Sequence, residues 1–558
     1  MESIRKHYSI IDMSDGMDAR LETNAYLDFA RGDFSQTPAL LAGLEGNQSD
    51  EARAHAFAIR AHLWFADLPG GELPDPAALR TTSRTTDAQP AALRAWVLLQ
   101  QARLLAFELE PALGAATEAA MLDGLDAASA IRRDFVQLAW EASQPDRSVT
   151  ARLTMLFDQA KGIGLAALTI DIQSLLGLAL LVRGELGQAT MVARRASRMA
   201  RTEGFPQQQY MANLLLARVR RLSGVPHLAT HILRALATIA PSPYQGWIRW
   251  ERVLAGTLSQ GNESTSSSAG RAAIILESVF EAAINGEPEA LRASSEALLQ
   301  KAREVPMIWH ETQDLCVALD AERPLSQASE PMNAWIRGES ALPPHGLYGV
   351  TKETGEEPTA ERDVGYVLVE PGRQPRRVLG LAKPTSGAAL FDDGRQTDRR
   401  KSRVETGLAV LALASLGPLE DRAFFRQVYG FEFNPAVHPA VLDALVSRMR
   451  KALGEAGRLN RDTGRLQIEF SRSAALPDPR CAQPVEERIL RVLVRAQDGS
   501  AKDAAARLGL PLRTIQEALR ELTEDGACIK RRDGRKIAYI VEDTTFAPPT
   551  QSGVSPRS

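Results

Sequence analysis

Two short stretches concentrate arginine and lysine at a spacing that suits binding to a polyanion. The first, VLDALVSRMRKALG (441–454), carries Ser447, Arg448, Arg450 and Lys451. The second, CIKRRDGRKIAYIVE (528–542), carries five cations around an Asp-Gly pair: Lys530, Arg531, Arg532, Arg535 and Lys536. An arginine fork can hold phosphate oxygens or read the O6 and N7 atoms of guanine without losing its charge. The expected chemistry is therefore recognition rather than catalysis.

The first stretch predicts an amphipathic helix. Its apolar residues recur at helical spacing and form one buried stripe, Leu442, Leu445, Val446, Met449 and Leu453, while Asp443, Ser447, Arg450 and Lys451 face elsewhere. The surrounding sequence predicts helices over 404–416 and 419–430, the loop FEFNPAVHP (431–439), this helix, and a hairpin over 458–470. Strand-like runs at 345–350, 363–370 and 376–382 predict a small sheet before them.

These elements resemble a known DNA-binding domain. The residues FFRQVYGFEFNP (424–435) and VSRMRKALG (446–454) are similar to the effector domain of OmpR/PhoB-type response regulators, a winged helix-turn-helix. The resemblance implies that 439–455 is the recognition helix in the major groove, with the hairpin as the wing. The DNA-facing residues it implies are Asp443, Ser447, Arg448, Arg450 and Lys451 on the helix, and Arg458, Arg461 and Arg465 on the wing.

Two neighbouring segments extend this interpretation. In the related regulators the loop before the recognition helix can touch RNA polymerase, so FEFNPAVHP is a candidate activation surface by resemblance, and RNA polymerase is a candidate partner. The run RQTDRRKSR (395–403) is either a solvated linker or an arm that contacts phosphates. We call residues 340–475 the first module.

Residues 484–546, the second module, repeat the same order of elements. Ser500 can cap a helix that begins at Ala501, Gly509 can end it, and Pro511 suits the start of the next helix. In that next helix, the residues predicted to face inward are Ile515, Ala518, Leu519 and Leu522, and those predicted to face outward are Arg513, Gln516, Glu517 and Arg520. The candidate DNA contacts on this helix are Arg513, Thr514, Gln516 and Arg520. Asp533-Gly534 predicts a tight turn between two strands. The module resembles MarR-like or ArsR-like winged helices, a class that also serves for dimerisation and protein binding.

The remaining part, residues 1–337, is predicted to be almost wholly helical, and we call it the helical half. Gly184 and Ala189 lie forty positions before Gly224 and Ala229, and small residues recur where two helices of a hairpin would approach. The pattern resembles a degenerate tetratricopeptide repeat (TPR), and an irregular helical bundle is the alternative. The expected fold class is mainly α: a TPR-like repeat followed by two winged helix-turn-helix (α+β) domains, with a disordered tail at 547–558.

Composition and missing motifs exclude other classes. The net charge of -3 excludes a chain that is basic throughout, and the three cysteines lack the spacing of a disulfide framework or a zinc site. His227 and His231 could hold a metal on one helical face, but helix packing is the better interpretation because no further ligand lies nearby in the sequence. No phosphate loop, hydrolase elbow or zinc-protease motif occurs, so we expect neither an enzyme nor a cofactor or metal. The first residues lack the apolar core of a signal peptide and no apolar run is long enough to cross a bilayer, so we expect a cytoplasmic protein without a membrane partner. Abundant arginine and alanine fit a bacterial source, in which a DNA-binding protein would be nucleoid-associated.

Two functions remain. The chain is either a sequence-specific transcription regulator, whose helical half binds a protein, peptide or small-molecule effector and controls two DNA-binding modules, or a TPR-type adaptor whose winged helices bind protein or mediate oligomerisation. Basic recognition helices and wings favour the regulator, with double-stranded DNA as its partner. Activation or repression, the target sequence and a homodimer are left open.

Overall fold

Helices dominate the computed structural model of the chain, and short strands are concentrated after residue 350. The structure describes residues 33–46, 50–65, 68–71, 116–142 without 124 and 126, 148–258, 268–340 without 304, 343–344, 351–352, 365–379 without 371, 388–389, and 399–541 without 415–416, 482–483, 497–498, 526 and 534–535. The mainly helical class expected from the sequence is confirmed at this coarse level. The predicted strand at 345–350, the tail at 547–558 and residues 395–398 of the basic run lie outside the described residues.

The helical half consists of antiparallel helices joined by short turns. Its described helices are α3 (Thr37–Glu45), α4 (Asp50–Phe65), α7 (Ala127–Ala142), α8 (Thr150–Gly162), α9 (Ala166–Val182), α10 (Leu186–Glu203), α11 (Pro206–Leu222), α12 (Pro226–Ile239), α13 (Ser242–Leu254), α14 (Ser268–Asn285), α15 (Pro288–Ala302), α16 (Pro306–Leu319) and α17 (Glu330–Ile336), with the short 3-10 helix η2 (Leu325–Gln327). A two-residue strand, β1 (Thr257–Leu258), pairs in parallel with β2 (Thr351–Lys352).

The predicted forty-residue repeat corresponds to two helical hairpins, α9–α10 and α11–α12. Gly184 and Gly224 end the first helix of each hairpin with φ of 75° and 78°, a left-handed conformation that glycine adopts without a Cβ clash. Gly177 lets α9 and α11 approach, because a Cβ there would lie 2.9 Å from Leu215 Cδ2. The hairpins therefore share one apolar core that continues through α13 to α17.

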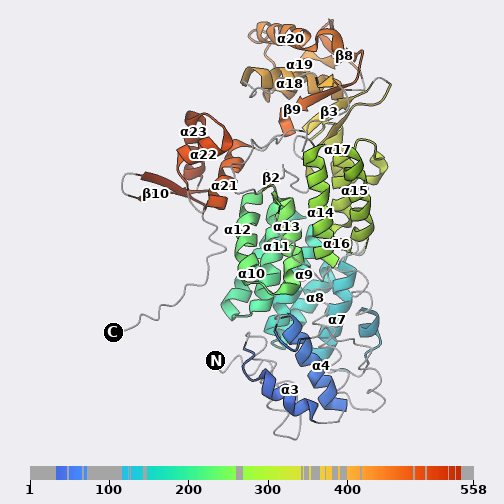
Figure 1. Ribbon diagram of the computed structural model, residues 1–558, viewed down its shortest axis with the longest axis vertical. Coiled ribbons are helices and arrows are strands. Elements are labelled where there is room, and N and C mark those ends of the chain that lie inside the picture. Colours follow the sequence, from blue (N-terminus) through green and yellow to red (C-terminus); the bar gives the residue numbers. More distant parts are fainter. Residues whose placement is uncertain are drawn as a thin grey trace.

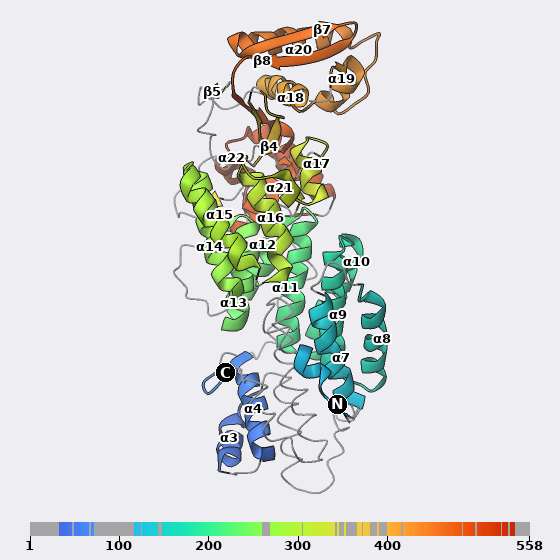
Figure 2. The same cartoon turned by 90° about the vertical axis from the view of Figure 1, so that its right-hand side faces the viewer.

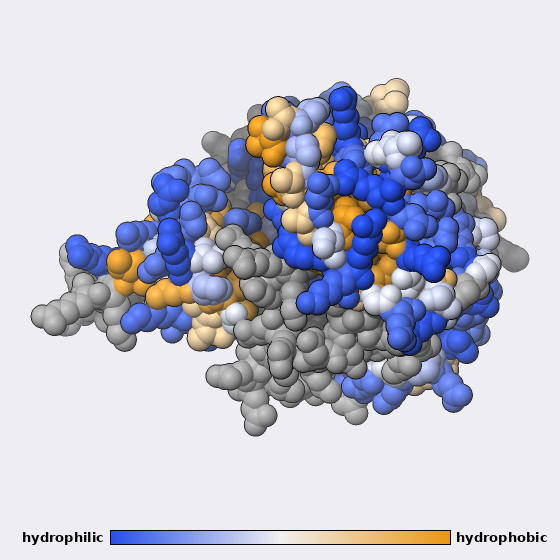
Figure 3. Space-filling model, turned by 90° about the horizontal axis from the view of Figure 1, so that it is seen from above, coloured by the Kyte–Doolittle hydropathy of each residue, from blue (hydrophilic) through white to orange (hydrophobic). Residues whose placement is uncertain are grey.

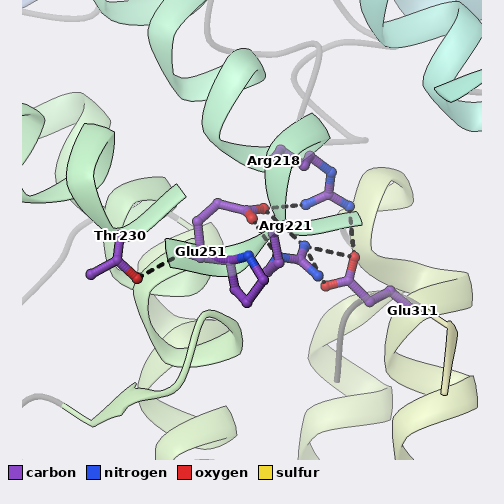
Figure 4. Close-up of polar contacts among 6 residues, drawn as sticks. Arg218, Arg221, Thr230, Glu251 and Glu311 are labelled. Atoms are coloured by element: carbon purple, nitrogen blue, oxygen red, sulfur yellow. Dashed lines mark hydrogen bonds and ion pairs between the residues drawn. The ribbon is translucent and has the colours of Figure 1, made fainter. Parts of the chain in front are cut away.

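A charged cluster lies inside this core where α11, α13 and α16 meet (Figure 4). Arg221 Nε donates to Glu251 Oε2 at 2.7 Å and its Nη2 to Glu311 Oε1 at 3.0 Å, while Arg218 reaches the same two carboxylates at 2.5 and 2.9 Å. Burial alone would lower the pKa of Arg221, but the charges of Glu251 and Glu311 outweigh it and raise that pKa. The guanidinium therefore stays charged and joins three helices.

The first module combines a helical core with two small sheets. Its elements are β3 (Gly365–Val369), β4 (Arg376–Val378), β5 (Ala388–Ala389), α18 (Arg399–Leu413), β6 (Leu419–Glu420), α19 (Asp421–Tyr429), α20 (Pro439–Leu453), η4 (Gly454–Ala456), β7 (Gly457–Asp462), β8 (Arg465–Phe470), β9 (Ala474–Asp478) and η5 (Pro479–Cys481). The strand orders are β4-β3-β9-β5 and β6-β8-β7.

Two boundaries in this module differ from the prediction. Leu419 and Glu420 were expected to begin a helix, but they form β6 and pair with Leu466 and Arg465 of β8, because the wing sheet offers their backbone hydrogen-bond partners. Strand β9 follows the wing and pairs with β3, so the sheet extends past the predicted end at 475 to Asp478.

The second module consists of α21 (Val485–Ala496), α22 (Ala501–Leu508), α23 (Leu512–Glu524), β10 (Ile529–Asp533) and β11 (Lys536–Ile540). Ser500 caps α22 as expected: its hydroxyl accepts from the Asp503 backbone N–H, and the Asp503 carboxylate accepts in return from the Ser500 backbone N–H. Gly509 ends the helix with φ of 61°. The strands form an antiparallel pair in which Asp533 faces Lys536.

The molecule is elongated. In Figures 1 and 2, α3 and α4 lie at one end, the helical hairpins form the middle, and the first module occupies the other end. The second module lies beside the upper part of the helical half, next to α12. Both modules are thus carried at or near the same end of the helical half.

Candidate nucleic-acid interface

Helix α20 has the two faces that its sequence predicts. Leu442, Leu445, Val446, Met449 and Leu453 are buried in the core of the first module. Gly407 on α18 allows this close packing, because a Cβ there would lie 2.8 Å from Met449 Sδ. Asp443, Ser447, Arg448, Arg450 and Lys451 are exposed.

Beside α20 lies the wing hairpin β7–β8. Asp462 pairs with Arg465, and the two residues between them, Thr463 and Gly464, have φ of 47° and 75°. Positive φ at both central positions is the geometry of a type I′ turn, which matches the twist of two antiparallel strands. Arg458 and Arg465 are exposed on this hairpin.

The predicted contact residues of the first module differ in whether a carboxylate of the module already pairs with their charge. Arg461 is half-buried between Asp421 and Asp443: its Nη2 lies 2.5 Å from Asp421 Oδ2, and its Nη1 pairs with Asp443. The hydrogen bonds that Arg461 donates to Asp421 are the largest contribution to its raised pKa. Arg461 and Asp443 therefore join α19, α20 and the wing. Both side chains form ion pairs inside the module.

Other predicted cations are less constrained. Arg450 Nε donates to the Leu459 carbonyl at 3.1 Å, and Arg465 lies 3.8 Å from Glu420 in an exposed pair. Within the described residues, Arg448, Lys451 and Arg458 lie near no carboxylate that pairs with them. These three are the most available for an external anion.

The loop before α20 is organised by aromatic stacking. Phe425 stacks on Tyr429 at 4.3 Å and on His438 at 4.7 Å between ring centroids. Arg403, the last residue of the basic run, donates to the Val428 carbonyl at 2.9 Å and lies over the Tyr429 ring, so this cation serves packing. Phe431 and Val437 remain 51% and 64% exposed, which leaves apolar surface on the predicted activation loop. Figure 3, which looks down on the end that carries the first module, shows mainly hydrophilic residues with smaller hydrophobic groups among them.

The second module presents a similar pair of elements. Ile515, Ala518, Leu519 and Leu522 of α23 are buried as predicted, whereas Arg513, Gln516 and Arg520 are exposed and Thr514 is half-buried. Arg520 forms an exposed pair with Glu524 at 3.2 Å. Lys530, Arg531 and Arg532 are exposed on β10, while Gly534, Arg535 and the side chain of Lys536 lie outside the described residues. The cations of this module therefore lie mainly on the hairpin, since α23 also exposes Glu517, Glu521 and Glu524.

Sequence reasoning missed the residues that attach the first module to the helical half. Arg376 donates to the carbonyls of Val317, Ala321 and Arg323 at 2.7 to 2.9 Å, and the Leu379 N–H donates to Ala318 at 2.7 Å. Val317 and Ala318 lie in the last turn of α16, where carbonyls lack a partner within the helix. The module thus caps the end of α16.

Arg377 caps the C-terminal end of α17 in a similar way. Its Nη1 donates to the carbonyls of Trp335 and Ser340 at 2.7 and 2.6 Å, and its Nη2 to Asp478 at 2.8 Å. Burial would raise the pKa of Asp478, but the hydrogen bond from Arg480 and the charge of Arg377 outweigh it and hold that pKa below its ordinary value. Arg377 is fully buried, so strands β4 and β9 and helix α17 form one junction.

The second module is attached through α21, which runs alongside α12. Glu487 accepts from the His227 backbone N–H at 3.1 Å, and its other oxygen lies 2.6 Å from His227 Nδ1. Seven residues further along both helices, Arg234 Nη1 donates to the Val494 carbonyl at 2.9 Å. The equal sequence offset shows that the two helices run parallel. The partner of His227 lies 260 positions away in the sequence, so no local signal could reveal this contact.

Comparison with protein-family models, with curated proteins and with solved structures finds no match to this chain. Among the described residues, no cluster of three or more histidine, cysteine or acidic side chains is arranged to hold a metal. None of the described helices is long and apolar enough to cross a membrane.

Proposed function

We propose that this protein is a DNA-binding transcription regulator, not an enzyme, in which the helical half carries and controls two winged-helix modules. The observation that supports this most is that both modules have the same arrangement of a helix and a β-hairpin. In each, a helix buries an apolar stripe and exposes polar and cationic residues, and a β-hairpin with exposed arginines follows it. Exposed cations without carboxylate partners favour a polyanionic ligand.

The roles of the residues follow from their positions. Arg458 on the first hairpin, and Lys530, Arg531 and Arg532 on the second, are suited to phosphate oxygens and would give affinity that falls with salt. Ser447, Arg448 and Lys451 on α20, and Arg513 and Gln516 on α23, are suited to base edges in the major groove. We assign Arg461 to positioning α20 rather than to DNA.

The test is selection of sheared genomic DNA by the full-length protein. Arg448→Ala/Lys451→Ala and Arg531→Ala/Arg532→Ala each remove two exposed cations from one module. Arg194→Ala/Arg198→Ala removes two exposed cations from α10 on the helical half and is the matched control. We expect a few enriched sites, weakened by either module variant and retained by the control. Uniform enrichment that all three variants share would contradict the proposal.

One observation favours the alternative, a protein adaptor. The second module already uses α21 as a protein-binding surface toward α12, and its α23 exposes acidic residues beside its arginines. Under this alternative, DNA binding would be weak and independent of sequence, and the exposed apolar residues Phe431 and Val437 would bind protein.

A further inference from the structure

Both modules are attached to the helical half by contacts that complete helix ends. The first module supplies donors to the C-terminal carbonyls of α16 and α17 through Arg376, Leu379 and Arg377. The carbonyls of Val317 and Ala318, in the last turn of α16, have no partner inside that helix, and the Trp335 carbonyl of α17 accepts from Arg377 as well as from the Gly338 N–H. These contacts attach the module to the ends of two helices of the helical half at once.

The second module and the helical half complete each other's helix ends. Helix α12 has no side-chain cap of its own, and Glu487 of α21 accepts from the N–H of its second residue. In return, Arg234 donates to a carbonyl in the last turn of α21. Arg491 Nη2 donates to the carbonyl of Ala255, which ends α13, at 3.1 Å. Helix α12 also contributes Leu228 to the core of the second module.

The connection between the modules is short as well. Strand β9 ends at Asp478 and α21 begins at Val485, so the two Cα atoms can be at most about 25 Å apart even if the chain between them were fully extended. In Figure 1, α20 lies at the end of the molecule remote from α3, and α23 lies on the side of the second module that is turned toward that same end. The two recognition helices are thus presented by one framework.

We propose that the helical half fixes the separation and relative rotation of the two recognition helices, so that the DNA it selects is bipartite with a single allowed spacing. This inference rests on the proposed function. A flexible tether would tolerate many spacings, because it only raises the effective concentration of the second module. A fixed framework tolerates one, since about 5 base pairs turn a half-site to the opposite face of B-DNA.

The test is a spacing series. The two half-sites of a genomic site are separated by inserted or deleted base pairs, and binding of the full-length protein to each DNA is measured. We expect one optimum that binds at least about 100-fold tighter than a single half-site, and a fall to the single half-site level when the spacing changes by about 5 base pairs. Equal affinity at every spacing, with half-site binding intact, would overturn the fixed framework but leave the proposed function standing. Absence of binding to either half-site would instead overturn the proposed function.

A variant pair tests whether the α12–α21 contact sets the spacing. Glu487→Ala/Arg234→Ala removes both reciprocal caps, and Glu486→Ala removes the neighbouring carboxylate, for which the structure gives no partner among the described residues. We expect the first variant to lose the optimum: its affinity at that spacing should fall to the level of the other spacings, with half-site affinity unchanged, because the reciprocal caps no longer fix α21 against α12. The control should keep the sharp optimum. A sharp optimum in the double variant, with half-sites still bound, would overturn the role of this contact.

Discussion

At the residue scale, the wing of the first module contains a strained position. Thr463 is the one non-glycine residue with positive φ among the described residues, and a β-branched side chain is disfavoured there. Thr463→Asn should raise the free energy of unfolding by about 0.5–1 kcal/mol, because asparagine tolerates this conformation. Thermal unfolding followed by circular dichroism measures the change. Gly464→Ala, at φ of 75°, should destabilise instead, and stabilisation by both substitutions would contradict the assignment of the turn.

The three cysteines are buried and reduced, as the sequence predicts. Burial raises the pKa of Cys316 to about 11 and that of Cys481 to about 12. The folded state therefore keeps these protons at a pH where the unfolded chain has lost them, so this contribution to stability is complete below about pH 9 and is lost as the pH rises toward 11 and 12. A thiol reagent at pH 8 should modify neither cysteine in the native protein and both after denaturation. Rapid modification of native Cys481 would show that its burial is wrong.

At the element scale, the buried cluster of Arg218, Arg221, Glu251 and Glu311 holds α11, α13 and α16 together. Glu311→Ala should lower the free energy of unfolding by about 3–5 kcal/mol, because it leaves a buried guanidinium short of a counter-charge. Tryptophan fluorescence measures the unfolding of this region, since Trp250 is next to Glu251 and Trp309 lies two residues before Glu311. Glu330→Ala is the control: that carboxylate pairs with Arg337 at the surface, where little stability is lost. Equal effects of the two substitutions would contradict the role of the cluster.

The elements show what local sequence can and cannot predict. The stripes of α20 and α23, the cap at Ser500 and the turns at Gly184 and Gly224 all follow from residues within a few positions of one another, and the structure confirms them. Strand β6 was mispredicted because its partner lies on β8, over forty positions later.

The predicted site depended on long-range contacts in the same way. Arg461 carries the same charge as Arg458 in the sequence, but Asp421 and Asp443, 40 and 18 positions away, engage it in the fold. The attachments through Arg377 and Glu487 join residues 42 and 260 positions apart, so no periodic pattern in the sequence reveals them.

At the scale of the whole molecule, the helical half is a support whose helix ends both modules complete. Under the proposed function, an effector bound to the helical half would act on DNA by changing the relative positions of α12 and α16, which carry the two attachments. Under the same proposal, the helical framework as well as the cationic faces takes part in DNA recognition.

The central claim is sequence-specific DNA binding, and the most direct test is the ratio of affinities for a genomically selected site and for a scrambled DNA of the same length at physiological salt. The account predicts a ratio of about 1,000 or more, as specific DNA-binding proteins show. Arg458→Ala should reduce the dependence of binding on salt by about one counterion, because Arg458 is the exposed wing cation assigned to phosphate oxygens. A ratio near 1, with binding lost at physiological salt, would contradict the regulator and favour the adaptor.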